Sequence, residues 1–530
     1  YIMKKIFILL AVVATLFASC SKDQLNTKPT QKIGGDGMMQ SSNSAIVALN
    51  GTYRLMYEWG QTVAGNYHQE IGPMGYALMA DLMGEDMVMA NMGSGWFWFD
   101  YIYNVKSRYA LSSWRPYGLW NFYYQLIGNV NSIIAAEETM QGPSEDVAYI
   151  IGQAYAIRAY CYHGLAVMFS RTYVGHESEK CVPIYTESTV AGTQGNPRST
   201  VEEVYKQINS DLDKAISLLE KTRNADNPSH MDKYVAYALK ARALSFMATT
   251  AADWKTVADY AQKAQGKGEV CKFDNVFNGF NSADPSYVMW GFKVQLDQST
   301  TNPQFMSHMD AYTNGGNAYG GRAPKCISKW LHDKIGENDA RQAWWNINNP
   351  IKAAKGLYLQ EKFLYDISKD NSNSKYSNWL CDRIYMRIEE MVLTEAEALC
   401  RAGDDNGARA ALNKLMKERD KSYDCSAKTG TALGALTTDE TGSLLEEILI
   451  QRRIELWGEY GRIYDIKRLK QGFVRTEEMG HPLAARTAVN NIKVNNPETY
   501  DWVMTIPQSE FDANKNMDEK ADQNPVDSGI

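Results

Sequence analysis

Apolar residues recur every three or four positions over much of the chain, a spacing that predicts amphipathic helices. In the first half of the chain, such helices are expected at residues 45–57, 119–138, 148–169, 200–220, 234–247 and 254–265. In the second half, they are expected at residues 391–402, 406–418 and 444–470. Ser199 or Thr200 would cap the helix at 200–220, with two glutamates in its first turn. The pattern therefore predicts a mainly α-helical fold.

Four of these segments form two pairs with a helix–turn–helix plan, 234–247 with 254–265 and 391–402 with 406–418. The second helix of each pair carries alanines three or four positions apart, namely Ala258, Ala261, Ala264, Ala408 and Ala411. Small residues at such positions let helices pack closely, as they do in tetratricopeptide-type repeats. We therefore expect helix pairs that stack into a tetratricopeptide-like scaffold. Ordinary antiparallel helix pairs are the alternative.

The segment 444–470 combines helical spacing with an unusual number of opposite charges. Its acids and arginines lie three residues apart, so on one continuous helix they would form a ladder of ion pairs. Paired acids can serve a glycosidase, but an arginine beside each acid would keep it ionised and unable to donate a proton. We therefore expect no catalytic residue here but a structural network, made of Glu455, Glu459, Arg462, Asp465 and Arg468.

The composition changes between residues 271 and 380, where Gly, Asn, Ser and aromatic residues dominate and helical periodicity fades until residues 325–335. Long loops in a compact protein usually carry function. We expect this loop-rich region to hold the ligand site. It would separate a helical region at 41–270 from another at 381–475, which is followed by an irregular tail at 476–530. The parts at 41–270 and 271–530 are expected to form one compact fold.

Aromatic residues are densest at 93–104, GSGWFWFDYIYN. In an extended strand, Trp96 and Trp98 would share one face, and the two phenylalanines would share the other. Exposed indoles offer a flat apolar surface for a sugar ring, and Asp100 lies close enough to bind hydroxyl groups. The segment is thus a candidate saccharide platform. The alternative is that all four rings pack inside the core.

The N-terminal residues have the pattern of an export signal. Lys4 and Lys5 precede an apolar run at 6–17 that is too short to span a bilayer, which predicts a signal peptide at residues 1–19. Small residues before Cys20 resemble a bacterial lipobox, and this implies lipidation of Cys20. Ordinary secretion with a free cysteine is the alternative. The polar residues 20–40 are expected to form a tether.

Composition and motifs argue against several classes of protein. A hydrophobic content of 44% predicts a large packed core, and a net charge of −7 argues against nucleic-acid binding. The seven histidines form no H-E-x-x-H motif, and the sequence has no G-x-S-x-G elbow or phosphate loop. The cysteines are scattered, without a C-x-x-C pair. We therefore expect no enzyme activity, no metal site and no cofactor.

Four motifs together resemble the SusD/RagB family of outer-membrane lipoproteins. Residues 455–468 resemble the family signature E-L-x-x-E-G-x-R-x-x-D-L-x-R, although tyrosine stands at the family's glycine and Gly461 follows it. Residues 198–215 resemble R-x-T-V-x-E-V-Y-x-x-I-x-x-D-L-x-x-A, and residues 387–398 resemble R-x-A-E-x-x-L-x-x-A-E-A. Residues 506–525 resemble I-P-x-x-E-x-x-x-N…Q-N-P. Together with the lipobox-like residues before Cys20, the matches run from about residue 20 to residue 530.

The resemblance implies a nutrient-binding lipoprotein on the outside of the outer membrane. It would bind an oligosaccharide or polysaccharide and deliver it to a SusC-like TonB-dependent transporter, without bond cleavage. RagB-type relatives imply peptide capture as an alternative, and a surface glycosidase is a third reading. Family members often bind glycan on an aromatic arc. The resemblance therefore implies ligand-binding candidates in two regions, namely Trp96, Trp98, Asp100, Trp290, Tyr312, Asn317, Tyr319 and Arg322.

Overall fold

The computed structural model describes residues 35–60, 68–104, 113–190, 192–222, 227–298, 303–313, 318–365 and 379–525. The predicted signal peptide, Cys20 and Asn317 lie outside these ranges.

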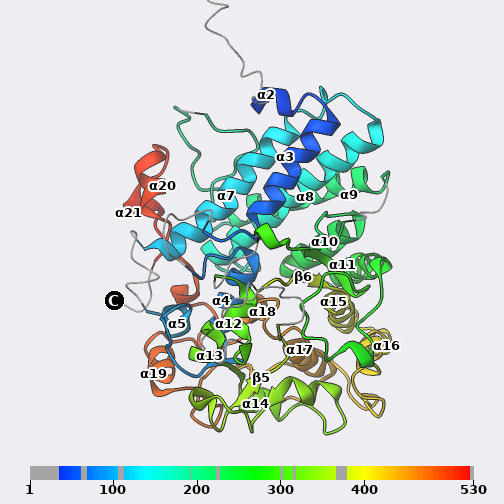
Figure 1. Cartoon of the computed structure of the whole chain (residues 1–530), viewed down its shortest axis with the longest axis vertical. Coiled ribbons are helices and arrows are strands. Elements are labelled where there is room, and N and C mark those ends of the chain that lie inside the picture. Colours follow the sequence, from blue (N-terminus) through cyan, green and yellow to red (C-terminus); the bar gives the residue numbers. More distant parts are fainter. Residues whose placement is uncertain are drawn as a thin grey trace, which may run out of the picture.

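The chain is mainly helical, as predicted (Figure 1). Its longer helices are α3 (Ser42–Leu55), α4 (Pro73–Met83), α7 (Trp114–Ile134), α8 (Ser144–Phe169), α9 (Val201–Leu219), α10 (Lys233–Met247), α11 (Ala251–Ala264), α15 (Ile388–Arg401), α16 (Asp405–Met416), α17 (Leu444–Glu455), α18 (Arg462–Leu469) and α19 (Leu483–Asn491). Its shorter helices are α2 (Gly35–Met38), α5 (Trp98–Tyr101), α12 (Phe305–Met309), α13 (Tyr319–Arg322), α14 (Lys329–His332), α20 (Gln508–Ala513) and α21 (Glu519–Asp522).

The long helices pack in series and form the frame of the molecule. Helix α7 packs on α8, α8 on α9, α9 on α10, α10 on α11, α11 on α15, and α15 on both α16 and α17 (Figure 1). The two predicted helix pairs meet through α11 and α15, where Ala258 and Ala398 are buried beside Trp254 and Val257. The small side chains allow this close approach of two helices. The alanines predicted at the contacts of α11 and α16 are all buried.

Local capping explains where several of these helices begin. Thr200 accepts a hydrogen bond from the backbone N–H of Glu203, and the Glu203 carboxylate accepts one from the backbone N–H of Thr200. This reciprocal capping box satisfies two backbone donors at the start of α9. Thr250 and Asp253 form the same arrangement at the start of α11. The cap predicted at residue 199 or 200 is therefore Thr200.

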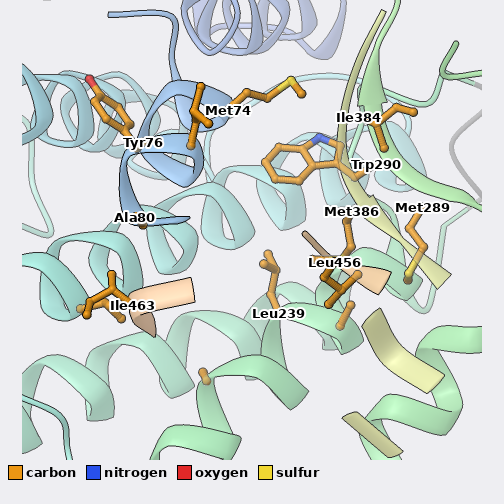
Figure 2. Packing of buried hydrophobic residues seen from close by; sticks show 14 of the residues in the cluster. Met74, Tyr76, Ala80, Leu239, Met289, Trp290, Ile384, Met386, Leu456 and Ile463 are labelled. Carbon is orange, nitrogen blue, oxygen red and sulfur yellow. The ribbon is translucent and has the colours of Figure 1, made fainter. Parts of the chain in front are cut away.

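Helix α4 was not predicted, because its sequence PMGYALMADLM is apolar on all sides. Almost every residue of α4 is buried, so the helix has no polar face and no helical period in its hydrophobicity. Met74 and Ala80 of this helix lie among the packed side chains in Figure 2. They belong to one cluster of buried apolar residues that extends along the chain from Ala45 to Met517.

Strands from the loop-rich region pair with β1 and β6, which lie outside it, to form two small antiparallel sheets that the sequence did not predict. One has the strand order β1 (Met87–Met89), β3 (Lys325–Ile327), β5 (Tyr358–Gln360), β4 (Trp345–Asn346), and the other pairs β2 (Val288–Phe292) with β6 (Arg383–Arg387). The strands are too short for alternation to be visible in the sequence. In the first sheet Met89 lies opposite Lys325, so the loop after β1 is held beside the chain that enters β3.

The expected continuous helix at 444–470 is wrong, because the chain bends between α17 and α18. Gly458 and Gly461 adopt φ values of +79° and +103°, which L-residues rarely adopt. The bend separates the acids and arginines that a single helix would have aligned. The ladder would have paired Glu459 with Arg462, Arg462 with Asp465, and Asp465 with Arg468. Of these, the pair of Asp465 and Arg468 is present at 2.9 Å. Arg462 turns instead to Glu85 and Asp86, at 2.9 Å from each.

Glu455 is fully buried at the centre of an ion cluster. Its carboxylate lies 2.8 Å from Arg419, 3.2 Å from Arg387 and 3.3 Å from Arg341. We define the Glu455 cluster as four acids and four cations in contact, namely Asp339, Glu389, Glu455, Glu459, Arg341, Lys362, Arg387 and Arg419. Burial alone would raise the pKa of Glu455, but Arg419, Arg387 and Arg341 hold that pKa well below its usual value. A carboxylate held in this way remains ionised and cannot serve as a general acid.

Two further ion pairs tie α17 and α18 to other parts of the chain. Arg452 of α17 lies 2.8 Å from Asp465 of α18, which joins the two helices across the bend. Arg468 binds Glu397 of α15 at 2.6 Å. Although burial opposes ionisation, Arg468 and Arg401 lower the pKa of Glu397 to about 2. All five network residues are thus ion-paired; Glu455, Arg462 and Asp465 are buried, and Glu459 and Arg468 are partly buried.

Candidate functional site

The aromatic segment at 93–104 forms a turn and a short helix, and the expected alternating strand is wrong. Gly95 has a φ of +88° and Phe97 a φ of +64°, after which α5 begins at Trp98. The Gln69 side chain stabilises this turn by accepting a hydrogen bond from the backbone N–H of Phe97 at 2.7 Å. The turn points the Phe97 ring into the core and leaves Trp96 partly exposed.

Three partly exposed rings from distant parts of the sequence meet at this turn: His68, Trp96 and Tyr319, which we call the platform. The rings of His68 and Trp96 are stacked, with centroids 5.2 Å apart and an interplanar angle of 20°. The Tyr319 ring lies 5.6 Å from His68, and its hydroxyl is hydrogen-bonded to His68 Nδ1. The structure therefore brings together two predicted site residues, Trp96 and Tyr319, through a histidine that was not predicted.

Buried groups beneath the platform fix its position. The His308 ring stacks on Tyr319 at 4.6 Å, and its Nε2 donates a hydrogen bond to the backbone carbonyl of His68 at 3.0 Å. Phe97 packs edge-on against His308 at 4.9 Å. Burial lowers the pKa of His68 and raises that of Tyr319, although a hydrogen bond from Trp96 opposes the rise. At neutral pH the platform is therefore uncharged, which suits contact with an uncharged ring face.

Two predicted ligand residues, Asp100 and Trp290, are buried and do not reach solvent. Asp100 accepts hydrogen bonds from Gln69 at 2.9 Å and from Arg115 at 3.2 Å, so it supports the turn from inside. Trp290 lies in the core near Ile384 (Figure 2), and its indole N–H donates to the Ser229 carbonyl at 3.0 Å. Their prediction as ligand contacts is corrected: β2 and the turn point both side chains inward.

The other predicted residues divide between the surroundings of the platform and a neighbouring cleft. Trp98 is partly exposed and packs on Tyr101 at 5.8 Å, with no ring contact to the platform among the described residues. The Tyr312 hydroxyl donates to Glu361 at 2.5 Å, and its ring packs on a small apolar cluster behind β3. Arg322, at the end of α13, is exposed and lines the cleft.

This cleft has a volume of about 750 Å³ and opens between three segments. They are residues 90–94 after β1, residues 321–322 of α13 and residues 350–353. The Asn91 amide donates to the Arg322 carbonyl at 3.2 Å, which joins the first two segments. Lys352 is exposed on the third segment, opposite Arg322 in the lining. Since α13 contributes Tyr319 to the platform and Arg322 to the cleft, the two features adjoin, and we treat them together as the candidate site.

Several participants were missed by sequence reasoning. His68 lies in a stretch without periodicity, and Lys352 lies in a loop with no motif. Trp114 starts α7 and packs edge-on against Trp96 at 6.4 Å, while Trp59 packs edge-on against His68 at 5.6 Å. The high density of Trp and Tyr before residue 120 was the available signal. Only the fold shows which of these rings meet.

Metal and membrane chemistry are not suggested by the part of the chain that the structure describes. In it, no group of three or more His, Cys, Asp or Glu residues is arranged to hold a metal ion. None of its helices combines the length and apolar character that crossing a membrane requires. The features described so far are a rigid helical frame, a partly exposed aromatic platform and an open cleft. Together they define a ligand-binding protein.

Comparison with known families identifies its relatives. Residues 247–526 match the model of the SusD family, and residues 73–244 match the SusD-like model described as starch-binding and associating with the outer membrane. The chain therefore belongs to the SusD family, which confirms the resemblance found in the sequence. A comparison with curated proteins finds no match.

Solved structures show the same fold. A SusD-like carbohydrate binding protein from Bacteroides vulgatus is 26% identical, with a TM-score of 0.73 over 92% of this chain and 99% of that chain. Surface glycan-binding protein A from Bacteroides thetaiotaomicron is 17% identical, with a TM-score of 0.65 over 92% of this chain and 100% of that chain. NanU from B. fragilis is 16% identical, with a TM-score of 0.62 over 94% of this chain and 99% of that chain.

Proposed function

We propose that this protein binds an oligosaccharide or polysaccharide at the cell surface through the platform and the adjoining cleft. The observation that carries the proposal is the stacked, partly exposed pair of His68 and Trp96 with Tyr319 beside it. Such rings bind the apolar face of a pyranose, while the polar groups of the cleft orient its hydroxyls. The 26% identical relative, a SusD-like carbohydrate binding protein, supports the same ligand class.

The protein would act by capture and transfer without bond cleavage. Family membership supports a lipid anchor on Cys20 at the outer face of the outer membrane and delivery of the glycan to a SusC-like TonB-dependent transporter. Replacing Cys20 with Ala should release the protein from the membrane fraction of the expressing cell. Persistent membrane association of Cys20→Ala would contradict this anchor. Co-purification of a TonB-dependent barrel with the lipidated wild type would test the partner.

Affinity electrophoresis through gels that contain soluble polysaccharides tests the binding proposal. Trp96→Ala should weaken the retarding interaction by about tenfold or more, because an aromatic anchor in a site contributes more than about 1 kcal/mol. Trp98→Ala is the matched control, since Trp98 is also partly exposed but lies outside the platform contacts. Equal loss in both variants would contradict the platform assignment. Absence of retardation on any polysaccharide, with binding of peptide pools instead, would favour the peptide-capture alternative.

A further inference from the structure

A second aromatic groove lies along α7, away from the cleft. Its volume is about 330 Å³, and we call it the α7 groove. Tyr117, Asn121, Tyr124 and Gly128 of α7 line one side. The other side comes from the loop at 185–189 and from α20, which lies beside α7 in Figure 1. This volume falls at the lower end of the range of small-molecule sites.

Helical spacing connects this groove to the platform. Trp114, Tyr117, Asn121, Tyr124 and Gly128 are separated by three or four residues, so they follow one stripe along α7. Trp114 at the start of this stripe packs edge-on against Trp96 of the platform. From Tyr117 to Gly128 the helix rises by about 17 Å. The groove therefore continues a line of partly exposed aromatic residues that begins at the platform.

The tyrosine walls of the groove are held in place by hydrogen bonds between their hydroxyls and backbone groups. The Tyr124 hydroxyl donates to the Pro183 carbonyl at 2.7 Å, and the Tyr185 hydroxyl accepts from the Asn196 backbone N–H at 3.0 Å. The two rings pack edge to face, with centroids 5.8 Å apart. Fixed walls reduce the entropy lost when a ligand binds.

Glu510 is fixed in the same way from the opposite side. Its carboxylate accepts hydrogen bonds from the Trp120 indole at 3.2 Å and from the Asn514 amide at 2.7 Å. A carboxylate has room for further hydrogen-bond donors after accepting two. Glu187 also lines the groove, and among the described residues its carboxylate forms no ion pair or hydrogen bond. Thus two acceptor groups adjoin the aromatic walls.

Gly128 leaves the floor of the groove open. A methyl group added to its Cα would meet no atom within 4 Å. Glycine in a helix interior costs about 0.5–1 kcal/mol relative to alanine, so nothing in the helix itself favours it there. The absent side chain instead leaves space between Tyr124 and the loop at 185–189.

We infer that the α7 groove is a second saccharide site, which takes an uncharged pyranose unit. Tyrosine faces would pack on the ring, and Glu187 and Glu510 would accept hydrogen bonds from its hydroxyls. Among the described residues that line the groove there is no lysine or arginine, and the two carboxylates would repel uronic or sialic acids. The inference extends the proposed function to a second place on the molecule. One long glycan chain could then occupy both sites, and its avidity would exceed the affinity of either.

Hydroxyl-radical footprinting with mass spectrometry tests both sites in one experiment. The full chain is oxidised with and without each of five neutral probes, maltohexaose, cellohexaose, xylohexaose, mannohexaose and laminarihexaose. Occupied aromatic residues are protected from oxidation. Protection of Tyr117 and Tyr185 reports on the α7 groove, and protection of Trp96 and Tyr319 reports on the platform. Because the reporters differ, failure of one proposal is distinguishable from failure of the other.

Two variants of Gly128 form the matched pair. Gly128→Ala adds a methyl group without a clash and should preserve the protection of Tyr117 and Tyr185. Gly128→Leu should fill the groove and remove that protection, with about a tenfold loss of affinity in the groove, while Trp96 and Tyr319 remain protected. Absence of protection at Tyr117 and Tyr185 with all five probes would overturn the inference. Unchanged protection in Gly128→Leu would overturn it as well.

Discussion

The interior beside α17 and the platform at the surface are built in opposite ways. In the Glu455 cluster every acid contacts a cation, and Glu455 of α17 is held by Arg387 of β6, by Arg341 of a short 3-10 helix and by Arg419 after α16. In the platform, three uncharged rings come from a turn, a four-residue helix and a loop. The cluster fixes the frame through contacts that tolerate little change. The platform depends on the frame but contributes little to it, so its residues can vary without loss of the fold.

This comparison predicts that the largest effect on stability comes from the cluster. Replacing Glu455 with Ala would leave Arg341, Arg387 and Arg419 buried beside too little negative charge. Breaking a buried ion pair by removing one partner costs about 3–5 kcal/mol, so the free energy of unfolding in urea should fall by about this amount. Glu138→Ala is the control, because Glu138 is exposed. If Glu455→Ala lowered the free energy of unfolding no more than the control does, the distinction between frame and platform would be wrong.

The bend between α17 and α18 is the next place to test the frame. An alanine at position 461 would have to keep a backbone φ of +103°, and its Cβ would lie 2.8 Å from Tyr464 and 2.9 Å from Ala80. Strained backbone of this kind costs about 1–3 kcal/mol, and overpacking at the two close contacts adds about 1–3 kcal/mol, so Gly461→Ala should lower the free energy of unfolding by more than the strain alone. Gly403→Ala is the control, since it has a similarly positive φ but no atom within 4 Å of the added Cβ. Equal losses in the two variants would show that the contacts at the bend contribute nothing.

These two regions also show what the sequence could predict. Helices such as α9, α11 and α16 were predictable because each has a polar face, whereas α4 was missed because its burial on almost all sides removes the periodic signal. The charged residues of α17 and α18 were assigned to a structural role, and the structure places them in ion pairs. Their partners were not predictable, because Glu85, Arg341 and Arg419 lie far away in the sequence.

The candidate site was less predictable than the frame for a physical reason. Trp96 and Tyr319 were identified by residue type, but their contact depends on His68 and on a turn with positive φ at Phe97. Trp290 has the same residue type as Trp96 and is buried. Whether an indole in a loop faces solvent depends on the packing of distant segments, and local spacing carries no record of that packing.

Lys325 is a buried cation outside the Glu455 cluster, so it departs from the comparison between a charged frame and an uncharged platform. Its substitution gives the smallest expected effect. Its ammonium group is fully buried in β3 and donates to the Ala323 carbonyl at 2.8 Å. In contrast to the cations of the Glu455 cluster, it pairs with no carboxylate among the described residues. Burial lowers the pKa of Lys325 from 10.5 to about 7 in the folded protein. Between these values the unfolded chain binds more protons than the folded chain, so the stability of the wild type should rise with pH across this window.

Lys325→Met replaces the amine with an apolar group of similar length, so the variant should be more stable than the wild type at pH 7. The free energy of unfolding of the wild type rises by up to about 1.4 kcal/mol per pH unit through this group. The difference in this free energy between the variant and the wild type, the gap, should therefore narrow as the pH rises from 7 to 10. Urea unfolding at four pH values measures the gap directly. Lys206→Met is the control, since Lys206 is exposed on α9 and its removal should leave a small gap that does not change with pH. If the free energies of unfolding of Lys325→Met and the wild type changed with pH in parallel, the lysine would be paired or solvated in solution. The charge beneath the platform would then be balanced, as the charges in the Glu455 cluster are.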